Sequence, residues 1–393
     1  MALDPTAWKT LTRGVTEIIN EHELVAKLDR GKPLNIKLGV DPTAPDIHLG
    51  FTVVMRKLRQ FQDLGHRVIL IVGDYTATVG DPSGRNKTRP ILSHAEVLRN
   101  AETYKKQFFK IVDETKTHVV YNGEWFSKMS FTEVTGLLSQ ITVAQMLERE
   151  DFQNRYRGGQ PISLHEFLYP MMQAYDSVMI DADVELGGMD QKFNVLRGRE
   201  LQRAMGKEPQ VGMFLPILLG TDGREKMSKS LGNTVGIDES PQSMYHKLYA
   251  LPDALIESYF ELLTDIPMDR VRNRIANQNP NAVKDELARN IVAQYHGAEA
   301  AERAAQEERR IHSGEAIPDN APRIIIGAGE HWVPALLVDA GISISNGEGR
   351  RLIENGGVTF DGVKILEGKA KVQITGEHVL RSGKRNYVRF VAG

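Results

Sequence analysis

The chain has 393 residues, of which 41% are hydrophobic and 25% are charged. This length allows two or three domains, and the composition is that of an ordinary soluble globular protein. No apolar run approaches the roughly 18 residues of a membrane-spanning helix, and the first residues lack the pattern of a signal peptide. The absence of cysteine excludes disulfides and thiolate metal sites and fits a cytoplasmic protein. A formal net charge of −2 requires that any contact with nucleic acid come from local basic patches.

Residues 34–220 alternate strand-like apolar runs with helical segments. Such alternation predicts a doubly wound, Rossmann-like α/β domain whose ligands bind outside the carboxyl ends of the strands. Strands are expected at residues 34–40, 68–72, 118–121 and 177–180. Ser93 and Glu96 form the capping box of a helix that runs toward Val112.

The turn after the first of these strands carries a first motif, GVDPTAPDIHLG, at residues 39–50. Apolar residues at helical spacing follow it, so backbone N–H groups and the positive end of a helix dipole would face an anion here. Thr43 and His48 can add side-chain donors. A histidine at a helix start more often caps or packs than reacts, and only a second motif further along the chain favours a functional role.

That second motif, GREKMSKSLGN, occupies residues 223–233 after a buried apolar run. Lys226 and Lys229 lie three positions apart among small residues, and the glycines on either side predict a mobile loop. The alternative is an exposed, solvated basic loop. Together, the two motifs favour a reaction in which negative charge builds up on a departing pyrophosphate.

Tyr169, Gln173 and Asp176 follow one another at i, i+4 and i+7, so they share one face of a helix. Polar residues in such a stripe are usually solvated, but large apolar neighbours here predict that water is excluded. A buried carboxylate must find a hydrogen-bond donor. A phenol hydroxyl is such a donor for Asp176.

Two glycine-rich turns flank this helix in the sequence. The first, residues 80–84, carries Asp81, which either accepts from an ammonium group or only shapes the turn. Arg85 and Arg89 behind it either reach phosphate or lie on the solvated surface. The second turn ends in Gln191.

After Ser230 the pattern changes to a small all-helical domain, with helical segments from Pro241 to Ile311 and no convincing strand. Residues 312–322 predict a linker. The remainder, residues 332–393, is expected to form a compact α+β unit. It carries nine Lys or Arg against six acids, an excess that suits RNA phosphates, although a merely solvated face is the alternative.

The two motifs resemble the HIGH and KMSKS signatures of class I aminoacyl-tRNA synthetases and are most similar to those of the bacterial tyrosyl enzymes. The similarity also includes the turn at residues 80–84, the segment 169–176 and residues 187–191, and it runs from about residue 34 to the C-terminus. In the last unit, residues 345–362 resemble a small RNA-binding module that is found in a ribosomal small-subunit protein and in pseudouridine synthases.

The resemblance implies a ligase that activates L-tyrosine with ATP to tyrosyl-adenylate and pyrophosphate, then transfers tyrosine to the 3′-terminal adenosine of tRNA(Tyr). Mg²⁺ would arrive with ATP, without a dedicated protein site. The implied catalytic residues are Thr43, His48, Lys226 and Lys229. Tyrosine would be bound by Tyr169, Gln173, Asp176, Asp81 and Gln191. ATP would be bound by Asp41, His48, Gly50, Lys226, Ser228 and Lys229, and tRNA by Arg350 and Arg351.

The resemblance also implies a domain organisation and a homodimer. A catalytic domain would span residues 1–225, with a dimer-forming insertion at about 121–160. Residues 226–322 would hold the signature loop, a helical anticodon-binding domain and the linker, and residues 332–393 the small RNA-binding domain.

One residue departs from the family pattern. The first signature usually ends in a second histidine, and this chain has Phe51 there, which cannot hydrogen-bond to ribose or phosphate. Two alternatives remain open. A tryptophanyl enzyme would share the fold and signatures, but the Tyr169–Gln173–Asp176 pattern argues against it. A synthetase-like RNA-binding or regulatory protein without activation is favoured slightly by Phe51 and disfavoured by the intact His48 and paired lysines.

Overall fold

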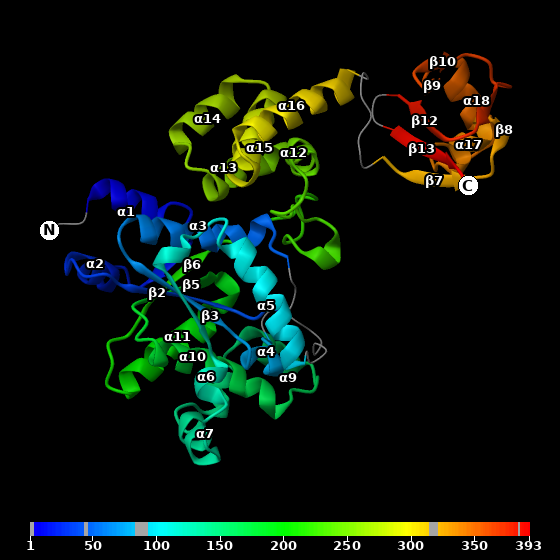
Figure 1. The fold of residues 1–393 in the computed structure, drawn as a ribbon. Helices are drawn as coiled ribbons and strands as arrows, with labels where there is room; N and C mark the ends of the chain where they lie inside the picture. The colour runs from blue at the N-terminus through cyan, green and yellow to red at the C-terminus, as the bar shows by residue number, and fades with distance from the viewer. Residues whose placement is uncertain (1–3, 43–45, 83–92, 314–320, 384–385) are drawn as a thin grey trace. The chain divides into compact units, whose positions relative to one another are not determined.

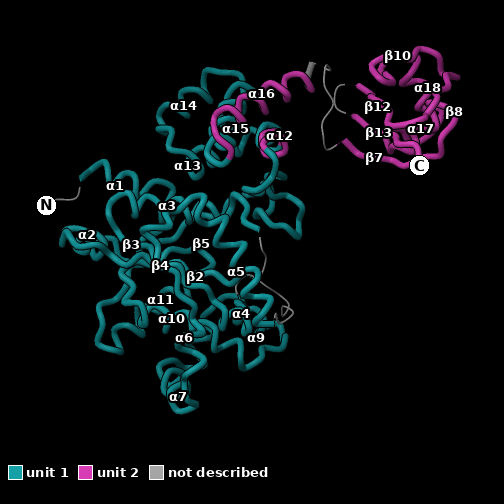
Figure 2. Tube along the Cα trace, viewed as in Figure 1, with its two compact units in different colours: residues 1–240, 247–295 teal, residues 241–246, 296–393 magenta. Residues whose placement is uncertain are grey.

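The computed structural model describes residues 4–42, 46–82, 93–313, 321–383 and 386–393 (Figure 1). The chain divides into two compact units (Figure 2), one of residues 1–240 and 247–295, the other of residues 241–246 and 296–393. Each unit is described by itself below. The domain boundaries predicted at residues 225 and 322 stay predictions.

The first unit is built around a six-stranded sheet of order β1-β6-β5-β2-β3-β4. Its strands are β1 (Glu17–Ile19), β2 (Asn35–Val40), β3 (Arg67–Val72), β4 (Thr117–Tyr121), β5 (Val184–Gly188) and β6 (Val211–Leu215). Every pair from β6 to β4 is parallel, and only the edge strand β1 runs antiparallel to its neighbour. The predicted doubly wound sheet is confirmed, with an antiparallel edge strand that the sequence did not predict.

Helices connect these strands and cover the sheet. They are α1 (Pro5–Thr12), α2 (Glu21–Asp29), α3 (Leu49–Asp63), α4 (Thr76–Val79), α5 (His94–Phe108), α6 (Gly123–Phe126), α7 (Phe131–Leu138), α8 (Val143–Met146), α9 (Glu150–Arg157), α10 (Leu168–Met179) and α11 (Lys192–Ala204). Figure 1 shows α3 on one side of the sheet and the α10–α11 pair on the other. Five of the six residues of β3 are buried, as expected for a parallel strand covered on both faces.

The order of the strands decides where a ligand can bind. From β2 the chain proceeds to β3 and β4 on one side of the sheet, then returns to β5 and β6 on the other. The strand order therefore reverses between β2 and β5. In open α/β sheets this switch point, outside the carboxyl ends of the strands, is where ligands bind.

One predicted strand is wrong. Residues 177–180 belong to the end of α10 and the turn after it, and the next strand begins only at Val184. A short apolar run reads equally well as a strand or as part of a buried helix, and periodicity alone cannot separate the two. By contrast, the capping box of Ser93 and Glu96 opens α5 as predicted.

Residues 241–311 are helical throughout, as predicted: α12 (Pro241–Tyr249), α13 (Ile256–Leu263), α14 (Met268–Asn277), α15 (Pro280–His296) and α16 (Ala298–Ser313), with one short 3₁₀ turn between the first two. In the described part of the chain, no helix is both long and apolar enough to cross a membrane.

The second unit contains a five-stranded sheet of order β10-β9-β12-β13-β7 and the two-stranded sheet β11-β8. Its elements are β7 (Arg323–Ile326), β8 (Gly329–Trp332), α17 (Val333–Asp339), α18 (Asn346–Glu354), β9 (Val358–Phe360), β10 (Val363–Ile365), β11 (Lys371–Ile374), β12 (Glu377–Ser382) and β13 (Asn386–Ala392). The two helices and the sheet share one buried core that includes Leu336, Ile353 and Phe390. The predicted compact α+β unit is confirmed.

Candidate active site

A cavity of about 440 Å³ opens at the switch point between β2 and β5. Its volume suits a small ligand. Many of the predicted site residues line it: Asp41, His48, Gly50, Asp81, Tyr169, Gln173, Asp176, Gln191, Lys226 and Ser228. The structure thus brings together residues from both sequence motifs and from the predicted pocket helix. Thr43, Arg85 and Arg89 lie outside the described residues.

Asp41 follows β2 directly and joins two other elements. Its carboxylate accepts from the Tyr169 hydroxyl at 2.9 Å and from the Thr76 hydroxyl at 2.8 Å. Gly73 at the end of β3 makes room for this cluster, because a Cβ there would collide with the Asp41 and Thr76 oxygens. Asp41 is therefore fixed before any ligand arrives.

His48 immediately precedes the first residue of α3. Its ring is buried against Phe51, with the ring centroids 4.5 Å apart, and its Nδ1 finds no hydrogen-bond partner among the described residues. Burial, together with the charge of Lys229, lowers the pKa of His48 to about 4. The imidazole is therefore neutral near pH 7, with one nitrogen able to donate and the other to accept.

Gly50 lets the two motifs approach each other. A Cβ on this residue would lie 3.0 Å from the His48 ring and 3.5 Å from the Cβ of Met227. Phe51 is half exposed, at 50%, beside the same ring. The first turn of α3 is thus the surface on which the lysine motif packs.

The lysine motif is anchored at several points. Met227 is buried, and its N–H donates to the Leu218 carbonyl at 3.0 Å. The Ser228 N–H donates to Asn233 at 2.8 Å. Lys226 lines the cavity, whereas Lys229 pairs with Asp46 at 2.6 Å, with both side chains partly exposed. Asp46 also lines the cavity. One of the two predicted positive charges therefore lines the cavity, and the other is held by an acid that does.

Asp176 on α10 is buried and accepts two hydrogen bonds. The Trp125 Nε1–H donates at 3.0 Å and the Asn122 Nδ2–H at 3.2 Å. Burial raises the pKa of Asp176 to about 7, against the attraction of Lys37 and the two donors, which favour the carboxylate. A buried carboxylate that keeps spare acceptor capacity can recognise a hydroxyl group.

The other polar residues of the cavity form one network. Gln173 donates to Glu185 at 3.0 Å and accepts from Asn194 at 2.9 Å. Gln191 donates to Asp81 at 2.9 Å, and Asn194 bridges to Gln191 at 3.2 Å. The predicted residues Gln173, Gln191 and Asp81 therefore hold one another in place.

Sequence reasoning missed several members of this site. Asn122 and Trp125 lie just beyond the carboxyl end of β4, and the position of a strand end was the signal that could have found Asn122. Lys37 is a charged residue between two buried apolar residues of β2, and Glu185 is a charged residue in the buried strand β5, so both had a readable signal. Asn194 had none, since it joins Gln191 to Gln173, which lies 21 positions earlier.

Arg350 and Arg351, the predicted tRNA contacts, lie on α18 in the second unit and are exposed. The Arg350 guanidinium stacks on the Trp332 ring, 4.8 Å from its centroid. Such stacking fixes the side chain while leaving its charge at the surface.

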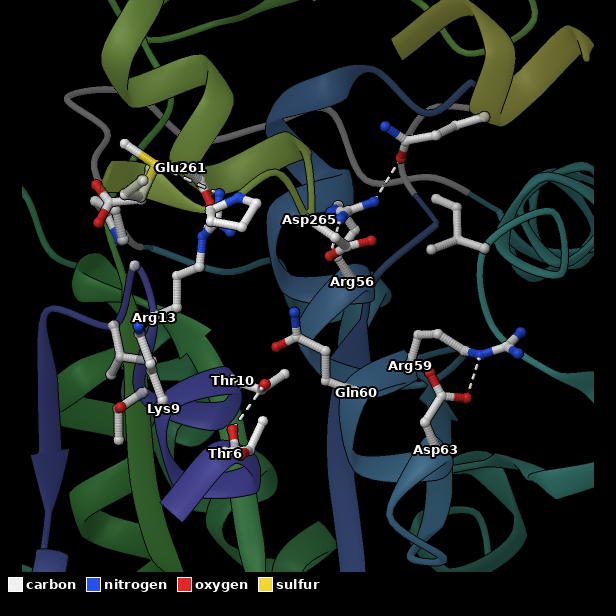
Figure 3. A pocket seen from close by; sticks show the side chains of 18 of the residues that line it. Thr6, Lys9, Thr10, Arg13, Arg56, Arg59, Gln60, Asp63, Glu261 and Asp265 are labelled. Carbon is white, nitrogen blue, oxygen red and sulfur yellow. Dashed lines mark hydrogen bonds and ion pairs between the residues drawn. The ribbon is translucent and has the colours of Figure 1, made fainter. Parts of the chain in front are cut away.

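A second, larger cavity of about 1340 Å³ lies in the first unit among α1, α3, α13 and α14 (Figure 3). Its charged side chains are largely engaged with the protein itself. Arg13 donates to the carbonyls of Phe260 and Glu261 at 2.8 and 3.1 Å, and Arg56 pairs with Asp265 at 2.6 Å. No predicted site residue lines this cavity.

Comparisons with known proteins establish the family of the chain. A family model described as tRNA synthetases class I (W and Y) matches residues 29–313, and one described as a tyrosine–tRNA ligase SYY-like C-terminal domain matches residues 314–390. A tyrosine–tRNA ligase of Moorella thermoacetica is 51% identical over 97% of this chain and 94% of its own length. The chain belongs to the tyrosine–tRNA ligase family. The ligase of Thermotoga maritima is 49% identical, over 98% of this chain and 97% of its own length.

Solved structures support the fold of this tyrosine–tRNA ligase family member. A truncated mitochondrial tyrosyl-tRNA synthetase of Coccidioides posadasii aligns with a TM-score of 0.62 at 23% identity, over 77% of this chain and 90% of that one. The tyrosyl-tRNA synthetase of Archaeoglobus fulgidus, solved with L-tyrosine, gives 0.62 at 20% identity, over 76% and 99%. At these identities the likeness concerns the fold alone.

Proposed function

We propose that the chain ligates tyrosine to tRNA(Tyr) in two steps, activation with ATP and transfer to the 3′-terminal adenosine. The observation that carries this is the buried Asp176 carboxylate in a cavity that both signature motifs also line. The sequence identity to tyrosine–tRNA ligases, which extends over nearly the full length of the chain, supports this proposal.

In the tyrosine pocket, Asp176 accepts the substrate's phenol O–H, with Asn122 and Trp125 holding its carboxylate in position. We assign the ammonium group to Tyr169, Gln173 and Asp81, which all line this cavity. Gln191 contacts the tyrosine and the adenylate. Phenylalanine would bring no hydroxyl, so Asp176 would keep only its two protein donors and lose the hydrogen bond from the substrate. A buried acceptor that is left partly unsatisfied carries a free-energy penalty.

In the activation step, an oxygen of tyrosine's carboxylate forms a bond to the α-phosphorus of ATP, and the bond to pyrophosphate breaks. Positioning and charge stabilisation supply the catalysis. Neutral His48 and Thr43 donate hydrogen bonds to phosphate, Asp41, Gly50 and Ser228 contribute to ATP binding, and Lys226 and Lys229 stabilise the departing pyrophosphate. Mg²⁺ enters this proposal only as the ion that ATP carries.

For tRNA, we assign the helical segment after Ser230 to the anticodon region and Arg350 and Arg351 to backbone phosphates. We further propose a cytoplasmic homodimer that pairs through residues 121–160. Three large hydrophobic side chains in this segment, Phe131, Val143 and Tyr156, are 87%, 63% and 66% exposed, and an interface would cover them. Phe126 in the same segment is buried within the chain itself.

The test is the exchange of labelled pyrophosphate into ATP, run in parallel with tyrosine, tryptophan and phenylalanine. Exchange that requires tyrosine, followed by charging of tRNA(Tyr), is the expected result. Exchange with tryptophan would point to the other specificity of the family model. Absence of exchange with all three amino acids would indicate an RNA-binding protein that has lost activation.

A further inference from the structure

A fully buried ion pair lies directly beneath the tyrosine pocket. Lys37 on β2 and Glu185 on β5 are register partners in the parallel sheet, at the switch point itself. Their side chains are 0% and 2% exposed, and Lys37 Nζ lies 2.9 Å from Glu185 Oε1. Neither residue belongs to the sequence motifs.

All three N–H bonds of the Lys37 ammonium are directed at acceptors. Besides Glu185, it donates to the Gln173 carbonyl at 2.8 Å and to the Ser177 hydroxyl at 2.6 Å. These two acceptors are four residues apart on α10, and Asp176 lies between them in the sequence. Lys37 is therefore hydrogen-bonded to the part of α10 that carries Asp176, the carboxylate proposed to recognise the substrate.

The Glu185 carboxylate is likewise surrounded by hydrogen-bond donors. Its carboxylate accepts from the Gln173 amide at 3.0 Å, from the Ser177 hydroxyl at 3.1 Å and from Gln210. The pair thus fixes both the backbone and the side chain of Gln173. No polar atom of Lys37 remains for a ligand, so the pair acts through its neighbours.

Stability alone does not account for such a pair. Removing two ions from water costs so much that well-packed apolar residues at the same positions are often as stabilising or more so. Two strands buried on both faces would accept apolar residues readily. What apolar residues cannot supply is an electric field, and both charges of the pair act on the ionisation of Asp176.

The charges around Asp176 come from several elements. Lys37 on β2 favours the carboxylate, and Glu185 on β5 opposes it. Asn122 and Trp125, beside α6, contribute neutral donors. Tyr169 on α10 also faces the site, with its hydroxyl bound to Asp41 after β2. Lys37 is the one cation in this set.

We propose that Lys37 and Glu185 are positioning residues of the tyrosine site, which hold Gln173 in place and set the charge state of Asp176 so that it accepts the substrate hydroxyl. This inference rests on the proposed role of Asp176. It assigns to the pair a part in amino-acid specificity that is exerted through Gln173 and Asp176.

The test compares Glu185→Gln with the double variant Lys37→Gln/Glu185→Gln. The single variant keeps the shape of the site. In the structure, the buried Oε1 of Gln210 has no hydrogen-bond partner among the described residues, so Gln210 can turn this oxygen toward the amide that the variant introduces. The readout is the pH dependence of kcat/KM for tyrosine in pyrophosphate exchange, whose acid limb reports the ionisation of the free enzyme.

The pKa of Asp176, about 7, places this limb near neutral pH, with kcat/KM falling about tenfold for each pH unit below it. Removing the negative charge of Glu185 should stabilise the carboxylate and move the limb to lower pH. Removing Lys37 as well should move it back to higher pH, by about one unit or more relative to the single variant. A damaged structure would not shift the limb in opposite directions.

Asp183→Asn is the matched control, since Asp183 pairs with buried Lys27 at 2.9 Å just before the same strand. It should lower the melting temperature and leave the acid limb in place. Coincident limbs in the wild type and both Glu185 variants would overturn the proposal. If the double variant does not fold, Glu185→Gln alone provides the test. An acid limb that stays in place or moves to higher pH in this variant would refute the proposal. Unchanged tyrosine affinity in Asp176→Asn would instead refute the assignment of Asp176 itself.

Discussion

The contact between Lys229 and Asp46 leads to a quantitative prediction about the lysine motif. The Lys229 ammonium pairs with Asp46 at 2.6 Å, with the side chains 40% and 56% exposed. An exposed ion pair is worth about 1 kcal/mol or less. Lys229 can therefore leave Asp46 for a phosphate at little cost, and the pair serves to hold the side chain near the cavity.

Lys229→Ala should slow adenylate formation about 150-fold, because loss of one preorganised charged contact raises the barrier by about 3 kcal/mol. Asp46→Asn should change the same rate less than about fivefold, since only the weak surface pair is lost. Lys207→Ala is the control, as Lys207 forms an ion pair of the same length, 2.6 Å, with the exposed Asp181. It should leave the rate unchanged.

The assay is single-turnover adenylate formation followed by fluorescence, with the Kd of tyrosine measured separately. Tyrosine affinity should be nearly unchanged in Lys229→Ala, because the contact forms only with the pyrophosphate. A parallel loss of tyrosine affinity would contradict this role. So would a loss in Asp46→Asn as large as that in Lys229→Ala, which would show that the ion pair itself is the functional unit.

Three further predictions concern other parts of the chain. Gly50→Ala should lower the rate of activation at least tenfold with little change in tyrosine affinity, because the added Cβ lies 3.0 Å from the His48 ring; equal activity would show that the ring moves aside freely. A chain ending near Pro322 should still exchange pyrophosphate but charge tRNA poorly, with a shallower salt dependence of tRNA binding; full aminoacylation would make residues 332–393 dispensable. Phe131→Glu should convert a dimer to a 43.9 kDa species in sedimentation without lowering the melting temperature of the monomer, since this side chain is 87% exposed; a wild type that already sediments as a monomer at micromolar concentration would remove the case for a dimer.

Much of the fold was readable because its signals are local. Three kinds of signal depend on neighbours within a few residues: the apolar runs of β2, β3 and β4, the capping box at Ser93, and the helical spacing of Tyr169, Gln173 and Asp176. The strand–turn–helix context of the first motif placed it correctly at the carboxyl end of β2. The sequence also predicted that Asp176 would be buried, from the apolar residues around it.

The rest of the site depends on partners that are distant in sequence. The donors to Asp176 come from residues more than fifty positions earlier. Lys37 meets Glu185 only because β2 and β5 are adjacent in the sheet, an adjacency that strand spacing does not reveal. The strand prediction for residues 177–180 was wrong for the opposite reason. It relied on a local apolar pattern, whereas α10 continues through most of these residues.

The packing around Arg13 bears on how the first unit unfolds. Lys57 on α3 donates to the carbonyls of Thr10 and Arg13 at 3.0 Å each. The Arg13 side chain in turn donates to the carbonyls of Phe260 and Glu261 on α13. The end of α1 is thus hydrogen-bonded to α3 on one side and to α13 on the other. If these contacts break, both neighbours lose partners at once. The sheet and α13 should therefore unfold in one cooperative transition, and fraying of residues 4–13 should destabilise both.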